Sequence, residues 1–113
     1  NGTSIDYAVM ESYPNVVTIE APFPWDDVGS WQALSRLHKP DDQGNTVVGT
    51  HLGIDTKGAI IHAQPGHTIV TIDVDDLIVV QTGDATLVAP KHAEERVREV
   101  VKELEARNQS ELL

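Results

Sequence analysis

An acidic turn between positions 23 and 31 carries the residue types best suited to chemistry in this chain. It reads FPWDDVGSW and places Asp26, Asp27 and Gly29 between the only two tryptophans of the sequence. An ionised aspartate in such a turn can hold a hard divalent cation, and the free backbone N–H groups of a helix that follows favour an anion. The residue types and their spacing therefore allow metal and phosphate chemistry.

The same turn also has a purely structural interpretation. Asp27 or Ser30 could cap the helix that follows, and Trp25 and Trp31 could fill a core. Spacing alone favours this plainer interpretation over a metal site.

The elements on either side of the turn are expected to be a strand and a helix. Residues 16–20 form a run rich in β-branched side chains, which predicts a strand. Residues 30–37 place Trp31, Leu34 and Leu37 at helical spacing, which predicts a helix. A carboxylate between a strand end and a helix start occupies the position where α/β enzymes place metal and phosphate chemistry.

A short helix is expected ahead of this strand. Thr3 or Ser4 could cap it, and it would end near Glu11, before the Tyr13-Pro14-Asn15 turn. Its inward face would carry Ile5, Ala8 and Val9.

The turn-rich, charged stretch 38–45 marks a change of pattern, so we expect one unit at 1–40 and a second at 41–113. The second unit contains short apolar runs separated by glycine or polar residues, which predict strands. These runs are Val47-Val48, 51–54, 59–62, 68–72, 77–80 and 86–88. The fold class is therefore α+β, mainly β, with a barrel, a sandwich or a coil of short strands as the possible β architectures.

A C-terminal amphipathic helix is expected from Lys91 to about Arg107. Two i,i+4 ion pairs, Glu94–Arg98 and Glu103–Arg107, would support its exposed side. Its apolar face, which would pack on the β unit or form a subunit contact in a homodimer, carries Ala93, Val97, Val100, Val101 and Leu104.

Three stretches resemble the mannose-1-phosphate guanylyltransferase family, sugar-phosphate nucleotidyltransferases that make GDP-mannose. SIDYAVME at 4–11 is similar to the family's S-I-D-Y-x-V-M-E, and WDDVGSW at 25–31 is similar to its W-S-D-V-G-S-W. The stretch from DLIVVQT at 76–82 to ATLVAPK at 85–91 resembles the family's D-L-I-V-V-x-T … L-V-x-x. The motifs stand in family order and cover most of the chain.

The resemblance also implies which part of the family's proteins this chain corresponds to. The family's glycine-rich nucleotide loop, G-x-G-x-R-x-x-P, and its E-K-P motif do not occur in this sequence. We therefore expect a C-terminal fragment that is inactive alone. Residues 1–40 would be a helix–strand–helix remnant of the catalytic domain, and residues 41–113 a short, single-stranded left-handed β-helix followed by the C-terminal helix.

The resemblance implies a metal-dependent reaction in which mannose 1-phosphate attacks the α-phosphorus of GTP and releases pyrophosphate. Both reactants are negatively charged, so Mg²⁺ must screen them. Two aspartates bind this metal in the family, and Asp27 matches the one in the W-x-D motif. Asp26 stands where the family usually has Ser, and no role is assigned to it.

Weaker substrate-binding roles follow for three further residues. The resemblance places the helix that carries Asp6 and Glu11 near the sugar pocket, although helix capping and surface charge would explain both residues equally well. Gly29 would allow the backbone to approach a substrate closely.

Composition excludes some classes of partner. The formal net charge of −10 argues against nucleic acid, because a phosphate backbone would be repelled. No run of residues is long enough to predict a membrane span. Cysteine is absent, which is compatible with the cytoplasm.

Two alternatives remain from the sequence. The chain could be a non-catalytic β-module for assembly or regulation, in which the tryptophan–aspartate turn is only structural. It could also belong to another sugar-1-phosphate nucleotidyltransferase, since the residues that read the base would lie upstream.

Overall fold

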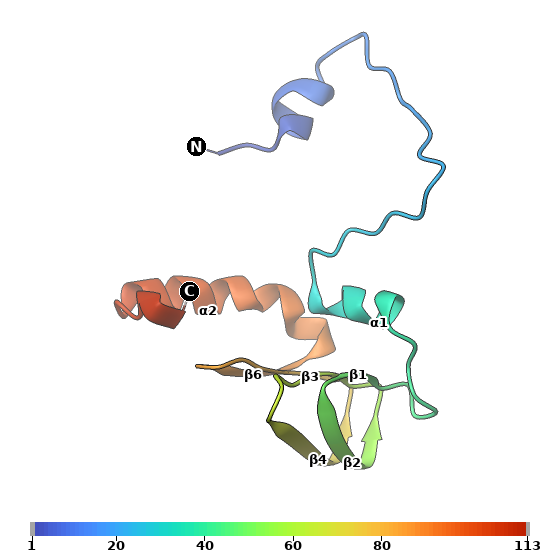
Figure 1. Cartoon of the computed structure of the whole chain (residues 1–113). Coiled ribbons are helices and arrows are strands. Elements are labelled where there is room, and N and C mark those ends of the chain that lie inside the picture. Colours follow the sequence, from blue (N-terminus) through green and yellow to red (C-terminus); the bar gives the residue numbers. More distant parts are fainter. Residues whose placement is uncertain (1, 113) are drawn as a thin grey trace.

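The structure is a computed structural model that describes residues 2–112 (Figure 1). Residues 2–30 run out from the rest of the molecule, and none of them is buried. Residues 31–112 form a β unit with short helices on one side. The radius of gyration is 18.2 Å, against about 13 Å for a compact chain of this length, because the N-terminal segment is extended.

The β unit is a coil of short, mostly parallel strands. Its strands are β1 (Thr46–Val48), β2 (Thr50–Lys57), β3 (Ile60–His62), β4 (Thr68–Asp75), β5 (Leu77–Gln81) and β6 (Thr86–Pro90). Each of the six apolar runs in the sequence falls on one of them, which confirms the mainly β prediction. Strands β1, β3 and β5 stack in parallel, β2 and β4 form a second parallel pair, and β6 closes the first sheet antiparallel to β5.

The register gives the repeat of this coil. Thr50 of β2 lies opposite Thr68 of β4, and Ile60 of β3 lies opposite Ile78 of β5, so this turn of the coil takes 18 residues. At the corner between β1 and β2, Gly49 adopts φ 100°, where a Cβ would overlap the carbonyl oxygen of Ala63. The corner therefore requires glycine both for its backbone conformation and for space.

Strands β3 and β5 are buried on both faces, as parallel strands usually are. Ile61 and Val79 face the interior of the coil, where partly buried side chains of β1 and β4 cover them. Ile60 and Ile78 belong to a second cluster, against which Trp31 and other partly buried side chains pack. The core therefore extends from the coil to the segment that begins at Trp31.

The N-terminal segment differs from the prediction. The predicted strand at 16–20 is wrong, since these residues have no regular structure and no strand partner among residues 2–112. A strand needs a neighbour to pair its backbone N–H and C=O groups. Val17 and Ile19 are more than 80% exposed, and Val16 is 46% exposed.

The predicted first helix is present as the single turn η1 (Asp6–Met10). Its N-cap is Ile5 with no side-chain cap bond, so the predicted cap by Thr3 or Ser4 is wrong. Its predicted inward face is also wrong, because Ile5, Ala8 and Val9 are exposed. Among residues 2–112, no residue of η1 is buried against another element.

The predicted helix at 30–37 forms as η2 (Trp31–Ala33) and α1 (Leu34–Leu37). The C-terminal helix forms as η3 (Lys91–Arg96) and α2 (Val97–Ala106), and a short turn η4 (Ser110–Leu112) follows. None of the described helices is long and apolar enough to cross a bilayer.

The C-terminal helix packs on the β unit mainly through its first part. Its start, η3, contacts β5 and β6, whereas α2 runs beyond the end of the short strands (Figure 1). Ala93, Val97 and Leu104 of the predicted apolar face are partly buried, whereas Val100 and Val101 are 48% and 40% exposed. Of the two predicted ion pairs, Glu103–Arg107 forms at 2.8 Å.

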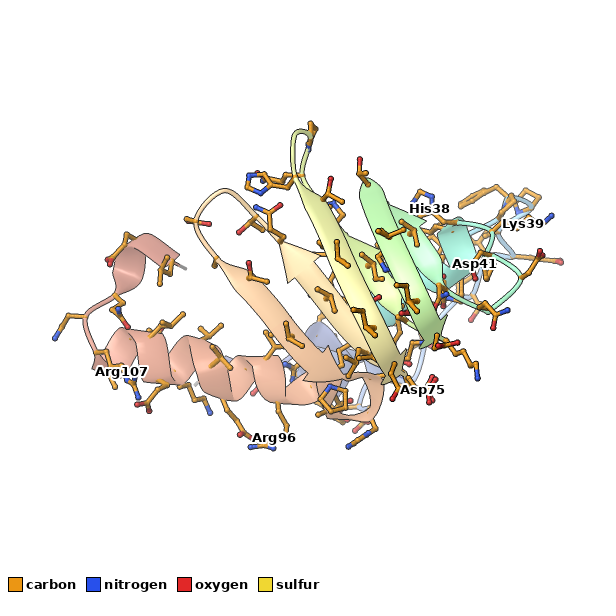
Figure 2. All side chains as sticks on the ribbon, turned by 90° about the horizontal axis from the view of Figure 1, so that it is seen from below. His38, Lys39, Asp41, Asp75, Arg96 and Arg107 are labelled. Atoms are coloured by element: carbon orange, nitrogen blue, oxygen red, sulfur yellow. The ribbon has the colours of Figure 1, made fainter. Side chains whose placement is uncertain are left out.

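The outer face of β2 and β4 carries exposed aliphatic side chains, and Figure 2 views these two strands from outside. Leu52 lies beside Val70, and Ile54 lies beside Ile72. All four are at least half exposed.

Candidate functional site

The acidic turn lies where the extended N-terminal segment joins the β unit, and Trp31 anchors it there. The Trp31 ring packs on the cluster of Ile60, Ile78 and Val80, and its centroid lies 5.9 Å from that of His62. Trp25 is 76% exposed. One tryptophan of the motif therefore fixes the turn to the β unit, while the other faces solvent.

Asp26 has a structural partner that the sequence did not identify. The Arg36 guanidinium donates to both carboxylate oxygens of Asp26, with Nε–Oδ2 at 2.6 Å and Nη2–Oδ1 at 2.5 Å. Its Nη2 also donates to the backbone carbonyl of Asp27 at 3.2 Å. The hydrogen bonds from Arg36 lower the pKa of the Asp26 carboxyl below its usual range. Arg36 therefore ties α1 back to the turn and holds Asp26 away from other ligands.

Asp27 presents an exposed carboxylate above Gly29. A Cβ at Gly29 would come within 3.2 Å of Asp27 Oδ1, so the glycine leaves room for this carboxylate. Among the interactions of the described residues, the Asp27 side chain takes part in no hydrogen bond or ion pair. Its hard oxygen atoms fit a divalent cation such as Mg²⁺.

The other two residues with predicted substrate roles lie elsewhere. Asp6 is in η1 and Glu11 directly follows it, at the far end of the extended segment from the turn (Figure 1). Among residues 2–112, no three His, Asp or Glu side chains converge in a group that could hold a metal ion. The structure thus brings Asp27 and Gly29 together but separates them from Asp6 and Glu11.

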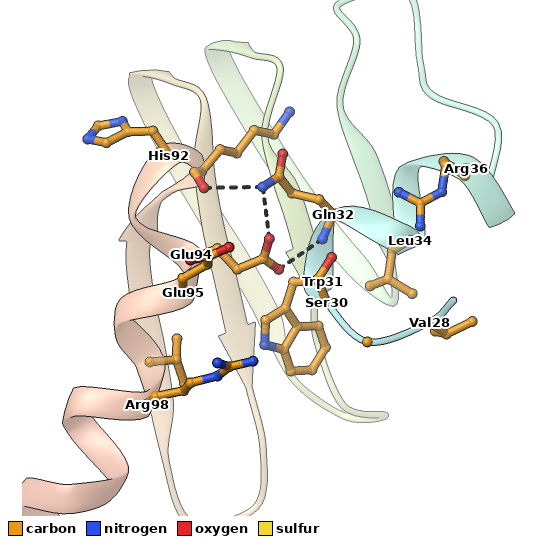
Figure 3. Close-up of a pocket in the computed structure, with 13 residues that line it drawn as sticks. Val28, Ser30, Trp31, Gln32, Leu34, Arg36, His92, Glu94, Glu95 and Arg98 are labelled. Carbon is orange, nitrogen blue, oxygen red and sulfur yellow. Dashed lines mark hydrogen bonds between the residues drawn. The ribbon is translucent and has the colours of Figure 1, made fainter. Parts of the chain in front are cut away.

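The helix after the turn receives its cap from the C-terminal part of the chain (Figure 3). Ser30 occupies the N-cap position but makes no side-chain cap bond, so capping by Ser30 is wrong. Instead, Glu94 Oε1 accepts from the backbone N–H of Gln32 at 3.1 Å. Glu94 Oε2 accepts from the Gln32 side-chain amide at 2.8 Å, and that amide also donates to the carbonyl of Lys91 at 3.3 Å.

This contact explains why the predicted Glu94–Arg98 pair is absent from the ion pairs of the described residues. The carboxylate of Glu94 is turned toward Gln32 instead of along its own helix. No local spacing signals this pairing, since 62 positions separate the two residues.

An open groove of about 810 Å³ lies between the turn and the start of the C-terminal helix. Its walls include Gly29 and Trp31 on one side, and His92 and Arg98 on the other. The groove combines apolar walls with cationic groups beside the acidic turn (Figure 3).

A second, polar cavity of about 400 Å³ lies at the entry to the coil. Buried Asn45 joins its parts, donating to Asp41 Oδ2 at 3.1 Å and to the carbonyl of Thr56 at 2.9 Å. His51 Nε2 lies 2.8 Å from the hydroxyl of Thr71. Burial lowers the pKa of His51, and the charge of Asp41 opposes that shift. Figure 2 marks Asp41 at this edge of the β unit.

Comparisons with known proteins identify relatives of the chain. The model of the MannoseP isomerase/GMP-like β-helix domain family matches residues 49–104, which run from the start of β2 to near the end of α2. The chain is 37% identical to the alginate biosynthesis protein AlgA of Pseudomonas aeruginosa over 108 residues, 96% of this chain and 22% of that protein.

Further relatives carry a more specific name. The chain is 39% identical to the mannose-1-phosphate guanylyltransferase ManC of Salmonella typhimurium, over 91% of this chain and 21% of that protein. It is 43% identical to a crystal structure described as mannose-1-phosphate geranyltransferase from Thermus thermophilus, with a TM-score of 0.74 over 91% of this chain and 31% of that one. The chain thus spans about a fifth of the length of these curated relatives.

Proposed function

Because the chain belongs to the mannose-1-phosphate guanylyltransferase family and matches the C-terminal region of its members, we propose that it forms the C-terminal part of such an enzyme. The substrates of the whole enzyme are mannose 1-phosphate and GTP, and the products are GDP-mannose and pyrophosphate. Within it, residues 1–40 complete the nucleotidyltransferase domain, and residues 41–113 form the β domain.

The observation that carries this proposal is the geometry of Asp27. Its carboxylate is exposed and lies above Gly29, on a turn held by Trp31 at one end and by the Asp26–Arg36 pair at the other. A loop fixed at two points presents one carboxylate in a defined direction, as a metal site requires.

The roles of the residues follow from the charges of the reaction. A phosphate of one substrate approaches a phosphorus of the other, and Mg²⁺ bound to Asp27 would neutralise part of the charge that opposes this approach. Asp27 would hold the cation, Gly29 would keep the space beside it open, and Arg36 would keep the competing Asp26 carboxylate engaged. The further ligands that a hard cation requires would come from the part of the enzyme outside this chain.

The exposed apolar side chains of the N-terminal segment support its place in a larger domain. Tyr7, Val17, Ile19 and Phe23 are each more than 60% exposed. A segment with so many exposed apolar side chains is expected to be covered by another part of the protein. In the whole enzyme, this segment would pack into the catalytic domain, and residues 16–20 would find their strand partner there.

The test is turnover of the full-length enzyme that carries this chain. The wild type is expected to make GDP-mannose from mannose 1-phosphate and GTP in a Mg²⁺-dependent way. The Asp27→Asn variant should lose about a hundredfold or more in kcat/KM, since even residues that only support metal ligands are worth about 10–100-fold.

Asp84→Asn is the matched control, because it removes one carboxylate from an exposed turn of the β unit. It should leave turnover unchanged. Turnover of Asp27→Asn within threefold of the wild type would contradict the ligand role, and a wild type without guanylyl transfer would contradict the proposed function.

A further inference from the structure

We propose that Glu94 is a positioning residue for the metal loop: it caps the helix that follows the acidic turn and thereby sets the direction of the Asp27 carboxylate. This inference rests on the proposed function of Asp27. It assigns to the β domain a direct part in the geometry of the site, through one carboxylate that lies 62 positions away from Gln32 in sequence.

The first argument is that the helix after the acidic turn has no local N-cap. The backbone N–H groups in the first turn of a helix need acceptors from outside the helix. Ser30, at the N-cap position, has extended backbone but makes no side-chain cap bond. Glu94 supplies the acceptor to the N–H of Gln32, so a residue of the β domain does what a local N-cap residue usually does.

The second argument is that the contact has two points. Glu94 binds Gln32 through the backbone N–H and through the side-chain amide, one carboxylate oxygen to each. The carbonyl of Lys91 adds a third contact to the same amide. Such a fork fixes the orientation of Gln32 as well as its distance from η3.

The third argument is the short path to Asp27. Only three residues, Val28, Gly29 and Ser30, separate Asp27 from Trp31, where the capped helix begins. The helix itself, η2 with α1, spans seven residues, too few to be stable alone. Its orientation therefore depends on Glu94 and on the packing of Trp31, and a displacement of about 1 Å at a reacting centre can cost a hundredfold in rate.

Amide hydrogen exchange of the 113-residue chain tests the capping itself, independently of activity. In Glu94→Ala the Gln32 N–H should exchange about tenfold faster or more, since a hydrogen bond to a charged group contributes at least that much. In Glu94→Gln the amide oxygen still accepts from one donor, so most of the protection should return. Glu105→Ala, an exposed residue of α2, is the control and should leave Gln32 unchanged.

Exchange at Ile60 and Ile78 serves as the internal reference for folding. Unchanged protection there, together with faster exchange at Gln32, is the expected result for Glu94→Ala. Unchanged exchange at Gln32 would overturn the inference. If Glu94→Ala lowers protection throughout the β unit, Glu94→Asp decides, because its carboxylate is one methylene too short to reach Gln32. Faster exchange confined to Gln32 then supports the inference, and wild-type exchange at Gln32 overturns it.

The full-length enzyme tests the link to the metal. Glu94→Ala should raise the Mg²⁺ concentration for half-maximal turnover about tenfold, with kcat at saturating Mg²⁺ lowered less than threefold, and Glu94→Gln should recover most of this loss. Unaltered Mg²⁺ dependence in Glu94→Ala, with an active wild type, would overturn this inference alone. An inactive wild type would overturn the proposed function, and this inference with it.

Discussion

Replacing Gly49 by alanine tests the close packing of the β coil. Gly49 lies at the corner between β1 and β2 with φ 100°, a conformation that costs an L-residue about 1–2 kcal/mol. The added Cβ would overlap the Ala63 carbonyl oxygen and lie 3.0 Å from its carbon. Backbone must then move, in a corner where Ala63 N–H donates to the Val48 carbonyl at 2.8 Å. Overpacking of this kind costs about 1–3 kcal/mol more.

Gly66→Ala is the matched control, because it separates the two effects. Gly66 has φ 89°, and a Cβ there would meet no atom within 4 Å. It should therefore lose only the backbone part, about 1–2 kcal/mol, whereas Gly49→Ala should lose about 2–5 kcal/mol. Urea unfolding followed by circular dichroism would measure both. Equal losses in the two variants would refute the claim that Gly49 is required for space as well as for backbone conformation.

Three further predictions concern the site and the polar cavity. Trp31→Ala should lower the free energy of unfolding by about 2–3 kcal/mol in urea titrations, below the usual range for a fully buried tryptophan because the ring is only partly buried, whereas exposed Trp25→Ala should change it by about 0.5 kcal/mol or less. Arg36→Ala should leave the free energy of unfolding nearly unchanged but increase the backbone mobility of Asp26 and Asp27 in ¹⁵N relaxation. Arg36→Lys should not restore order, because an ammonium cannot make the two-point contact. Unchanged relaxation in both variants would contradict the view that the Asp26–Arg36 pair fixes the turn. Burial holds the pKa of His51 below its usual 6.5, so the unfolded chain takes up a proton at a higher pH than the folded chain does. The contribution of neutral His51 to the free energy of unfolding is therefore complete above about pH 6.5 and decreases as pH falls below it. A His51→Gln variant that keeps the same slope of stability against pH would show that another group is responsible.

The parts of the fold that the sequence predicts are those that depend on neighbouring residues. The run Ile60-Ile61 indicates a strand because β-branched side chains suit the pleated backbone wherever the strand pairs. The spacing of Trp31 and Leu34 likewise predicts a helix from local periodicity alone. In both cases the structure confirms the local pattern.

The parts that the sequence mispredicts depend on partners at a distance. Residues 16–20 have the composition of a strand but no strand partner among residues 2–112, and composition carries no information about a partner. Glu94 has an arginine four positions on, so helical spacing predicts an ion pair, yet the carboxylate binds a helix start that only the folded coil brings close.

At the acidic turn the sequence identifies the residues but not all of their contacts. Asp27 and Gly29 are adjacent in space because they are nearly adjacent in sequence. The contact of Asp26 with Arg36 spans ten positions, and it requires a helix that turns back toward the loop. Which of two neighbouring aspartates is already engaged thus becomes visible only in three dimensions.

The reversal of β6 has a consequence for how this fold can vary in evolution. By running antiparallel to β5, β6 delivers Lys91 and Glu94 to the level of Gln32. Inserting one more turn of the coil between β5 and β6 would shift η3 by one strand spacing, about 4.8 Å, and would separate Glu94 from Gln32. Natural selection for the geometry of the acidic turn should therefore keep the number of turns of the coil constant. Insertions should accumulate instead at outward corners such as the one around Gly66.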